Sequence, residues 1–379
     1  MQIEQKTWIR DTQWDQGQLG GLDHDPQVVF VLAGKAALKE PGILAGICDR
    51  YPAANVFGCS TAGEIRGTRV LDDSLVATAV YFEHSAVQGA QVDVDESVGS
   101  HDAGQYLAQA LDKDGLRHVF VLSDGLRVNG SDLVRGLTEY LPGDVKVTGG
   151  LSGDGNRFQE TIVVCEGRAS SGSVAVLGLY GQRLKVGYGS RGGWDSFGPE
   201  RLITRADGNV LYELDGRSAL DLYKQYLGEH AAGLPATGLL FPLSLRGVDG
   251  ETGIVRTILA VDEQNQSMTF AGDLPEGAYA RLMKANVDRL IDGAEGAADV
   301  CRRALGPVPS ELAILISCVG RKMVLKQRVE EEVESVQSTL GIQTILTGFY
   351  SYGEISPFSP NAKCALHNQT MTITTLSEK

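Results

Sequence analysis

The sequence predicts a mixed α/β fold, with helices layered on mixed sheets, repeated strand-helix-strand units and two domains. Its 379 residues exceed what one hydrophobic core usually serves. Apolar residues make up 42% of the chain and charged residues 22%, which is typical of a folded globular protein. The 47 glycines indicate many tight turns, which suit a mixed α/β protein better than a helical bundle.

One unit recurs three times along the chain: an apolar strand, an amphipathic helix, a second short strand, a glycine turn and a further alternating strand. In this order the segments are residues 28–32, 43–51, 55–57, 58–65 and 74–82 in the first unit; 118–122, 133–140, 145–148, 149–154 and 161–165 with 173–180 in the second; 312–316, 322–340, 343–346, 348–355 and 370–376 in the third. The succession mixes crossover and hairpin connections, which predicts mixed sheets.

The turns of the first and third units share the pattern Gly-x-x-x-x-Gly-Glu-Ile, at residues 58–65 and 348–355. The middle turn, residues 149–154, is shorter and carries Asp154 in place of the glutamate. A shared octet at such a distance in the chain indicates duplicated supersecondary units. We therefore expect the first and third units to superpose.

A stretch rich in small residues, 228–235, follows a helical segment and is the best domain boundary. It predicts an N-terminal domain at residues 26–227 and a C-terminal domain at residues 228–379. The acidic run at residues 330–334 falls within the long helix of the third unit. Its simplest interpretation is a solvated helix face.

The net charge of −14 argues against nucleic acid and against an anionic membrane surface as partners, because both attract basic proteins. The N-terminus lacks the basic start and apolar run of a secretory signal, and no segment reaches the roughly 20 apolar residues of a membrane span. The six cysteines are scattered and form no CxxC pair, which is typical of reduced thiols. We expect a cytoplasmic protein.

Several catalytic motifs are excluded. A glutamate follows the second glycine of each octet where a phosphate-binding loop needs lysine. The pattern Gly187-x-Gly189-x-x-Gly192 lacks a following helix and is interpreted as a glycine-rich turn, not a dinucleotide site. Cys59 and Cys318 end predicted strands and leave open an enzyme that uses a cysteine nucleophile, although buried, inert thiols are the favoured interpretation.

Polar side chains in the C-terminal half are candidates for ligand binding, since strand ends and their loops are where open α/β sheets bind ligands. These candidates are Arg246, Cys318, Arg321, Glu354, His367 and Asn368. Arg321 offers a planar fork for a carboxylate, and Glu354 offers a partner for an amine or for His367. We expect Arg321, Glu354 and His367 to line one cleft, with Arg246 near its rim. The alternative is a structural Arg321–Glu354 ion pair beside a buried histidine.

Residues 56–65 resemble the hallmark of the FIST N-terminal domain. Residues 348–355, residues 366–370 and the pattern Cys318-x-x-Arg321 resemble the FIST C-terminal domain, so that the likeness runs from about Val28 to Thr375. This resemblance implies a sensory module of signal transduction that binds a small ligand such as an amino acid. A homo-oligomer is left open.

The chain is also similar in domain content to stand-alone bacterial FIST proteins that sense nitric oxide with haem. That likeness implies haem as a cofactor, and a histidine kinase or a cyclic-di-GMP enzyme as the partner. The chain has no CxxCH attachment motif, so its haem would be non-covalent. His367 is then the expected iron ligand, because in a strand it shares an apolar face with Met371 and Ile373. An amino-acid-like sensor without haem is the alternative.

Overall fold

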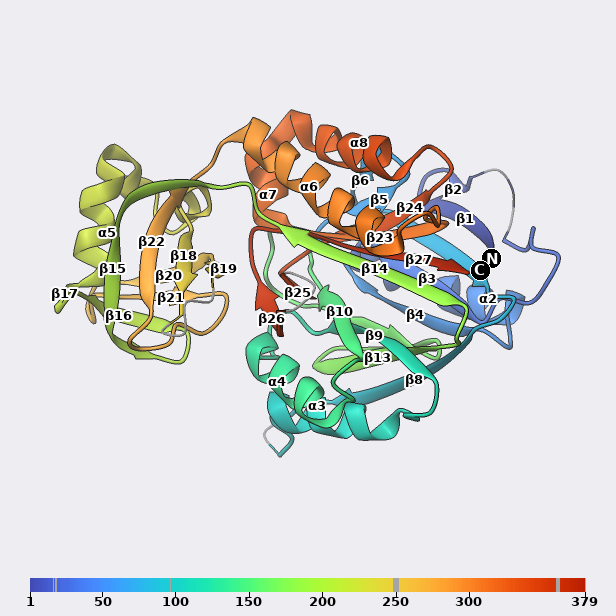
Figure 1. Ribbon diagram of the computed structural model, residues 1–379. Helices are drawn as coiled ribbons and strands as arrows, with labels where there is room; N and C mark the ends of the chain where they lie inside the picture. The colour runs from blue at the N-terminus through green and yellow to red at the C-terminus, as the bar shows by residue number, and fades with distance from the viewer. Residues whose placement is uncertain (16, 18, 96, 248–251, 359–361, 379) are drawn as a thin grey trace.

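The computed structural model describes residues 1–379 except 16, 18, 96, 248–251, 359–361 and 379. Figure 1 shows a large body with both chain termini side by side and a smaller unit (yellow) joined to it by two chain segments. The large body holds three sheets. The smaller unit holds a fourth, whose strands all come from the stretch of sequence between β15 (Asp195–Asp207) and β22 (Tyr279–Lys284). The predicted mixed α/β fold is confirmed.

The three sheets of the large body are built alike. The first has the order β12-β11-β4-β3-β7-β1-β2, the second β26-β25-β10-β9-β13-β8 and the third β14-β27-β23-β24-β5-β6. At the centre of each lies one parallel pair: β3 with β4, β9 with β10, or β23 with β24. An antiparallel strand, β7, β13 or β27, follows the pair's first strand in the sheet.

The strands of these sheets have the following bounds. They are β1 (Gln2–Ile9), β2 (Gln13–Trp14), β3 (Val28–Ala33), β4 (Asn55–Ser60), β5 (Glu64–Arg66), β6 (Arg69–Leu71), β7 (Leu75–Tyr81), β8 (Ala86–Asp93), β9 (Leu116–Ser123), β10 (Lys146–Leu151), β11 (Val163–Cys165), β12 (Arg168–Ser170), β13 (Ser173–Tyr180), β14 (Leu184–Arg191), β23 (Leu312–Cys318), β24 (Ile345–Ser351), β25 (Gly353–Pro357), β26 (Cys364–His367) and β27 (Met371–Glu378).

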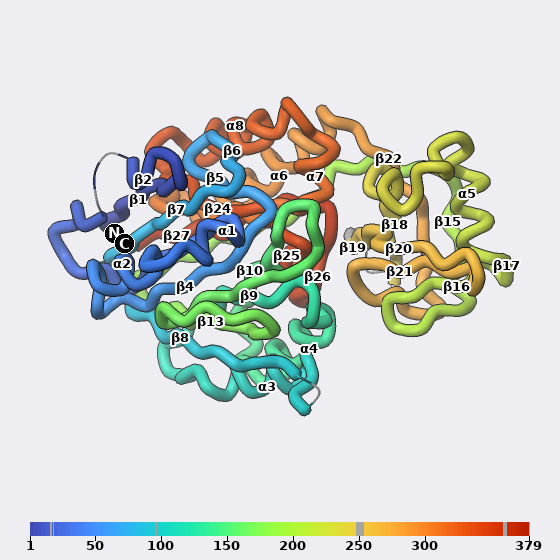
Figure 2. Tube along the Cα trace, turned by 180° about the vertical axis from the view of Figure 1, so that it is seen from behind, coloured from blue at the N-terminus to red at the C-terminus, as the bar shows by residue number. Residues whose placement is uncertain are grey.

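Helices cover the outer face of each sheet. They are α1 (Lys35–Leu38), α2 (Ile43–Arg50), α3 (Ser100–Ala110), α4 (Gly130–Tyr140), α6 (Val287–Leu305), α7 (Val319–Leu325), η3 (Lys326–Arg328) and α8 (Val329–Leu340). Figure 1 shows α3 and α4 below the second sheet and α6 and α8 above the third, and Figure 2 shows α1 and α2 beside the first. The helix expected over 322–340 is divided at Lys326, whose φ is +52°.

The strand after each turn leaves its own unit and joins the sheet of another. β5 pairs with β24, β11 pairs with β4 and β25 pairs with β10. The exchange is cyclic, so the three units are related by an approximate threefold axis. Three matching backbone bonds close the ring: Ala62 N to Tyr350 O at 2.8 Å, Gly153 N to Ser60 O at 2.9 Å and Tyr352 N to Leu151 O at 3.1 Å. The expected equivalence of the first and third octets is confirmed.

The same steric constraint explains the first glycine of each octet or turn. A Cβ at Gly58, Gly149 or Gly348 would lie 1.8–2.0 Å from a main-chain oxygen of the neighbouring parallel strand. No side chain fits in that space, so glycine is required at the same position of all three units.

The prediction that Asp154 of the middle turn takes the place of the glutamate in the other two turns is wrong. Glu64 stands on β5 and Glu354 on β25, whereas the matching strand β11 begins with Val163. Asp154 instead accepts main-chain N–H bonds from residues 158–160. The middle unit has a longer loop before its exchanged strand, and spacing from the first glycine alone does not reveal that loop.

The glycine pattern at 187–192 is not a turn over most of its length. Gly187 and Gly189 lie in β14, and a Cβ at either would meet main-chain oxygens of α6 at 2.8 and 2.4 Å. These glycines let the helix approach the strand closely. The dinucleotide interpretation remains excluded because β14 leads into β15, not into a helix.

The smaller unit packs around its own apolar core, which includes Leu211, Tyr223, Met268 and Phe270. Its remaining elements are β16 (Val210–Leu214), β17 (Arg217–Ser218), α5 (Ala219–Leu227), η1 (Gly228–Gly233), η2 (Ala236–Leu240), β18 (Leu243–Arg246), β19 (Thr252–Arg256), β20 (Ile258–Asp262) and β21 (Ser267–Phe270). Residues 228–235 thus lie within this unit. The division of the sequence at residue 228 stays a prediction.

Candidate ligand site between the two bodies

A cavity of about 390 Å³ lies between the large body and the smaller unit. The large body contributes the loop after β9, the junction of β23 with α7, Tyr352 and Asn368. The smaller unit contributes Thr257 and residues 270–273. The C-terminal ends of β9 and β23 therefore meet at a cavity, but Arg321, Glu354 and His367, which were expected to line one cleft, are not among its lining residues. Its volume falls within the range of small-molecule sites, about 300–1,000 Å³.

Two polar side chains in the cavity wall have no hydrogen-bond partner within the described part of the chain. Asn368 is 1% exposed, and both its Oδ1 and its Nδ2 are unpaired. Thr257 is 4% exposed, and its Oγ1 is unpaired. Buried polar atoms are nearly always bonded, because an unmet donor or acceptor costs about 1–3 kcal/mol. One such group comes from each body, so the cavity has hydrogen-bonding capacity on both sides.

Charged groups of both signs also line this cavity. Arg127 is exposed and forms no ion pair with any residue that the structure describes. Asp273 is half-buried and accepts a bond from Asn129 Nδ2 at 3.3 Å. A cation and an anion in one small cavity suit a ligand that carries both charges.

Arg256 fixes the smaller unit against the large body next to the cavity. Its buried guanidinium donates to the carbonyl oxygens of Leu366 and Asp273, both at 3.0 Å. No carboxylate among the described residues forms an ion pair with it, and burial lowers the pKa of Arg256 to about 10. A neighbouring groove of about 1,090 Å³ is lined in part by Arg256, Asp273 and Leu366, and Asp273 also lines the cavity.

An aromatic pair forms part of the wall. The rings of Phe158 and Tyr352 stack at 4.5 Å between centroids and 14° between planes. The Tyr352 hydroxyl donates to Asp154 and lies 3.0 Å from the Gly155 carbonyl oxygen. These bonds fix the Tyr352 ring, which gives the cavity a rigid apolar surface.

Of the residues proposed from the sequence, Cys318 and Asn368 line the cavity. Cys318 is buried, and burial raises the pKa of its thiol, as it does for Cys59. A thiol in that state is a poor nucleophile. Arg246 lies elsewhere, on the smaller unit, where it pairs with Glu200 at 2.8 Å and stacks on the Tyr279 ring.

Arg321 is fully buried and is used inside the protein. Its guanidinium donates to Glu332 at 2.8 and 3.1 Å and to the Leu290 and Gly192 carbonyls. Glu332 also accepts bonds from Ser317 Oγ at 3.1 Å and Tyr350 Oη at 2.7 Å. The solvated-face interpretation of the acidic run is thus wrong for Glu332. Its spacing from the buried Val336 was the helical signal that would have revealed it.

Glu354 ties its turn to the last strand. Its carboxylate accepts bonds from Ser351 Oγ at 2.6 Å, Thr370 N at 3.1 Å and Thr370 Oγ1 at 2.9 Å. Glu64 is bonded in the same way to Thr61 and Ser74. Burial raises the pKa of Glu354 to about 8 and that of Glu64 to about 7.

A pH effect on stability follows from Glu354. Because the folded protein holds this proton up to about pH 8, while the unfolded carboxyl loses it near 4.5, stability falls as pH rises through that window. Glu354→Gln should flatten this decline in the free energy of unfolding, measured by urea titration from pH 4.5 to 8. The exposed Glu334→Gln is the control. A slope unchanged by Glu354→Gln would contradict this assignment.

His367 is buried and neutral. Its Nε2 bonds to the Ser356 carbonyl at 2.9 Å, while its Nδ1 has no partner in the described ranges. Burial lowers the pKa of His367 to about 4. His367 lies in neither the cavity nor the adjacent groove, so its surroundings do not fit a haem bound through this side chain. Within the described residues, no three His, Cys, Asp or Glu side chains gather as a metal site.

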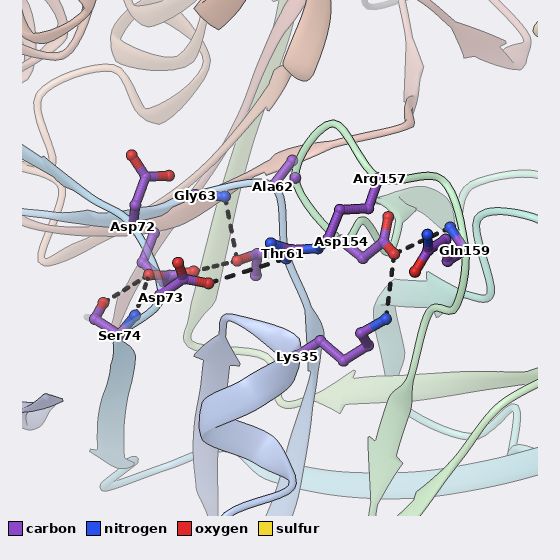
Figure 3. A network of polar contacts seen from close by, with 12 residues as sticks. Lys35, Thr61, Ala62, Gly63, Asp72, Asp73, Ser74, Asp154, Arg157 and Gln159 are labelled. Atoms are coloured by element: carbon purple, nitrogen blue, oxygen red, sulfur yellow. Dashed lines mark hydrogen bonds and ion pairs between the residues drawn. The ribbon is translucent and has the colours of Figure 1, made fainter. Parts of the chain in front are cut away.

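A third hollow, of about 540 Å³, lies where the turns of the first two units meet α7. Figure 3 shows how its surroundings are linked. Lys35 Nζ lies 3.4 Å from an Asp154 carboxylate oxygen, Thr61 Oγ1 accepts a bond from Gly63 N, and both Thr61 and Ser74 donate to Glu64. Lys322 pairs with Asp72 across this region and donates to the Ala62 carbonyl at 3.0 Å. These charges hold the units together.

Comparison with known proteins identifies the family. The family model of the FIST N domain matches residues 27–217, and that of the FIST C domain matches residues 219–357. The chain belongs to the FIST family. FIST domains are sensory domains of signal-transduction proteins. The resemblance seen in the turn octets is therefore confirmed.

Individual relatives add little to this assignment. The FIST chain is 24% identical over 331 residues to the uncharacterised protein MJ1623 of Methanocaldococcus jannaschii, covering 81% of this chain and 62% of that protein. It thus spans less than two thirds of this relative's length.

The chain was also matched to solved structures, among them the following two. Cyanuric acid hydrolase from A. caulinodans has 10% identity and a TM-score of 0.19, with 78% of this chain and 99% of that chain covered. PurLQS from Thermotoga maritima has 9% identity and a TM-score of 0.16, with coverage of 93% and 66%. Neither score indicates a shared fold. In the described ranges, no helix combines the length and the hydrophobicity that crossing a membrane requires.

Proposed function

We propose that this FIST protein senses a small amino-acid-like ligand, which binds in the cavity between the large body and the smaller unit. The observation that carries the proposal is a pair of unbonded, buried polar groups in the cavity wall, Asn368 from the large body and Thr257 from the smaller unit. A ligand that satisfies both would bridge the two bodies. Its binding energy would then favour one relative arrangement of them, which is the minimum that a sensor needs.

The charged groups support this ligand class. Arg127 and Asp273 both line the cavity. In this proposal Arg127 takes a carboxylate and Asp273 takes an ammonium group. Phe158, Phe270 and Leu239 supply apolar surface for a side chain. The aliphatic and aromatic lining favours a ligand with a compact body over a long, highly charged one.

The partner is proposed on the family likeness alone. A histidine kinase or a cyclic-di-GMP enzyme is the expected receiver of the signal, and ligand-dependent pull-down with such an enzyme is the direct assay. We do not propose haem as the ligand of this site, because the surroundings of His367 do not fit it. Titration of the protein with haemin, followed at the Soret band, gives an independent check of that disagreement.

Isothermal titration calorimetry with the free amino acids tests the proposed function. We expect at least one to bind, and Arg127→Gln to weaken that binding about tenfold or more, since a charge-assisted bond is lost. Arg135→Gln, on the exposed face of α4 where it pairs with Asp132, is the matched control. An absence of binding across the panel, or equal affinities in wild type and Arg127→Gln, would refute this mode of recognition.

A further inference from the structure

We infer that the ligand carries a carboxamide edge, meaning a hydrogen-bond donor next to an acceptor, and that Asn368 reads this edge. The inference rests on the proposed function, since it names the chemistry of the ligand in the same cavity. An asparagine amide presents one acceptor oxygen and two donor hydrogens in a plane. In Asn368 neither end is used by any described part of the chain.

Hydrogen bonds of the neighbouring residues fix the chain on both sides of Asn368. The Gln369 carbonyl accepts a bond from Trp194 Nε1 at 2.9 Å, and Thr370 is bonded to Glu354 through both its N–H and its hydroxyl. His367 is fixed by the Ser356 carbonyl. With both flanks fixed, the main chain at Asn368 is preorganised, which lowers the conformational entropy lost when its amide binds a ligand.

The threefold relation offers a comparison within the molecule. Ser74 and Thr370 occupy equivalent places, because each bonds the carboxylate of its own unit's octet, so Asp72 is the counterpart of Asn368. Asp72 has an internal partner, since its carboxylate pairs with Lys322. Asn368 lacks such a partner among the described residues and faces a cavity instead.

The unbonded donor and acceptor of Asn368 determine which chemical group of a ligand fits best. A carboxylate would satisfy only Nδ2 and an ammonium group only Oδ1, whereas an amide edge satisfies both at once. Such edges occur in amino-acid side-chain amides and in nucleobases, which asparagine recognises in the same bidentate way. The stacked ring of Phe158 on the cavity wall suits a flat group of this kind.

The test uses the full chain and matched pairs of probes: glutamine with glutamate, and nicotinamide with nicotinate, with adenine as the nucleobase arm. We expect each amide to bind at least about tenfold more tightly than its acid, by calorimetry. Asn368→Leu should abolish this preference and Asn368→Asp should reverse or remove it. Asn265→Leu is the control, because Asn265 is exposed, lies outside the cavity lining and already donates to Asp262 at 2.8 Å.

Glutamine binding without adenine binding would assign the edge to an amino acid and support both the inference and the proposed function. Adenine binding without any amino acid binding would support the amide edge but overturn the proposed amino-acid-like ligand. Acids that bind as well as their amides would overturn it, as would a preference that survives Asn368→Leu in a variant with an unchanged unfolding transition. If other amino acids bind but no amide does, the inference fails while the proposed function stands. If no probe and no amino acid binds, both fail.

Discussion

Glu332→Leu is expected to lower the free energy of unfolding by about 3–5 kcal/mol, because it leaves the buried guanidinium of Arg321 without a carboxylate. Both side chains of this pair are fully shielded from solvent. Ser317 and Tyr350 also lose the acceptor of their hydroxyl bonds. Urea unfolding measured by circular dichroism at pH 7 gives the value directly.

The double variant Arg321→Leu/Glu332→Leu separates the charge from the packing. It should be less destabilised than the sum of its two single variants, since the cost of each single variant is largely an unpaired buried charge. Glu331→Leu, which removes the exposed partner of Arg328, is the control and should change stability little. Additive single variants would show that the ion pair does not stabilise the third unit as described.

Gly348→Ala is expected to destabilise the protein by about 3 kcal/mol or more. Its Cβ would lie 2.0 Å from the Leu315 carbonyl oxygen, and both residues belong to the hydrogen-bonded parallel pair β23 and β24. The overlap is with main chain, so no side-chain rotation relieves it and the strands must separate. The same change at Gly58 should have a similar effect, because the two positions are equivalent.

Gly46→Ala is the matched control for these glycines. Gly46 lies in helix α2 with no atom within 4 Å of its ideal Cβ, so alanine there should be neutral or stabilising by up to about 1 kcal/mol. Thermal unfolding of the three variants side by side compares them. Stability close to wild type in Gly348→Ala would contradict the close approach of the strands.

The repeated units could be predicted because local patterns encode them. The octets, the apolar runs and the helix between them mark each unit. The second strand of each unit forms near its expected place, but β4, β10 and β24 extend into the segments expected as turns. The exchange of β5, β11 and β25 between units could not be predicted, since pairing partners far apart in sequence leave no trace in local periodicity. The threefold arrangement therefore emerged only from the pairing of the strands.

The candidate site was predicted in part. Cys318 and Asn368 were found because they stand at strand ends, where loops converge. Thr257, Arg127 and Asp273 were missed, since the smaller unit supplies or faces them and its position depends on contacts such as Arg256 to Leu366. The sequence wrongly favours Arg321 as a ligand-binding residue, because its partner, Glu332, lies within a run of charged residues whose pattern is typical of a solvated helix face.

A crystal structure of the full chain grown with saturating glutamine tests the central claim most directly. We predict density for the amino acid between the two bodies, with its amide bonded to both ends of the Asn368 side chain and a further bond to Thr257 Oγ1. Ordered water alone in that cavity, or glutamine bound only elsewhere, would contradict the claim that this FIST protein senses the side-chain amide of an amino acid between the large body and the smaller unit.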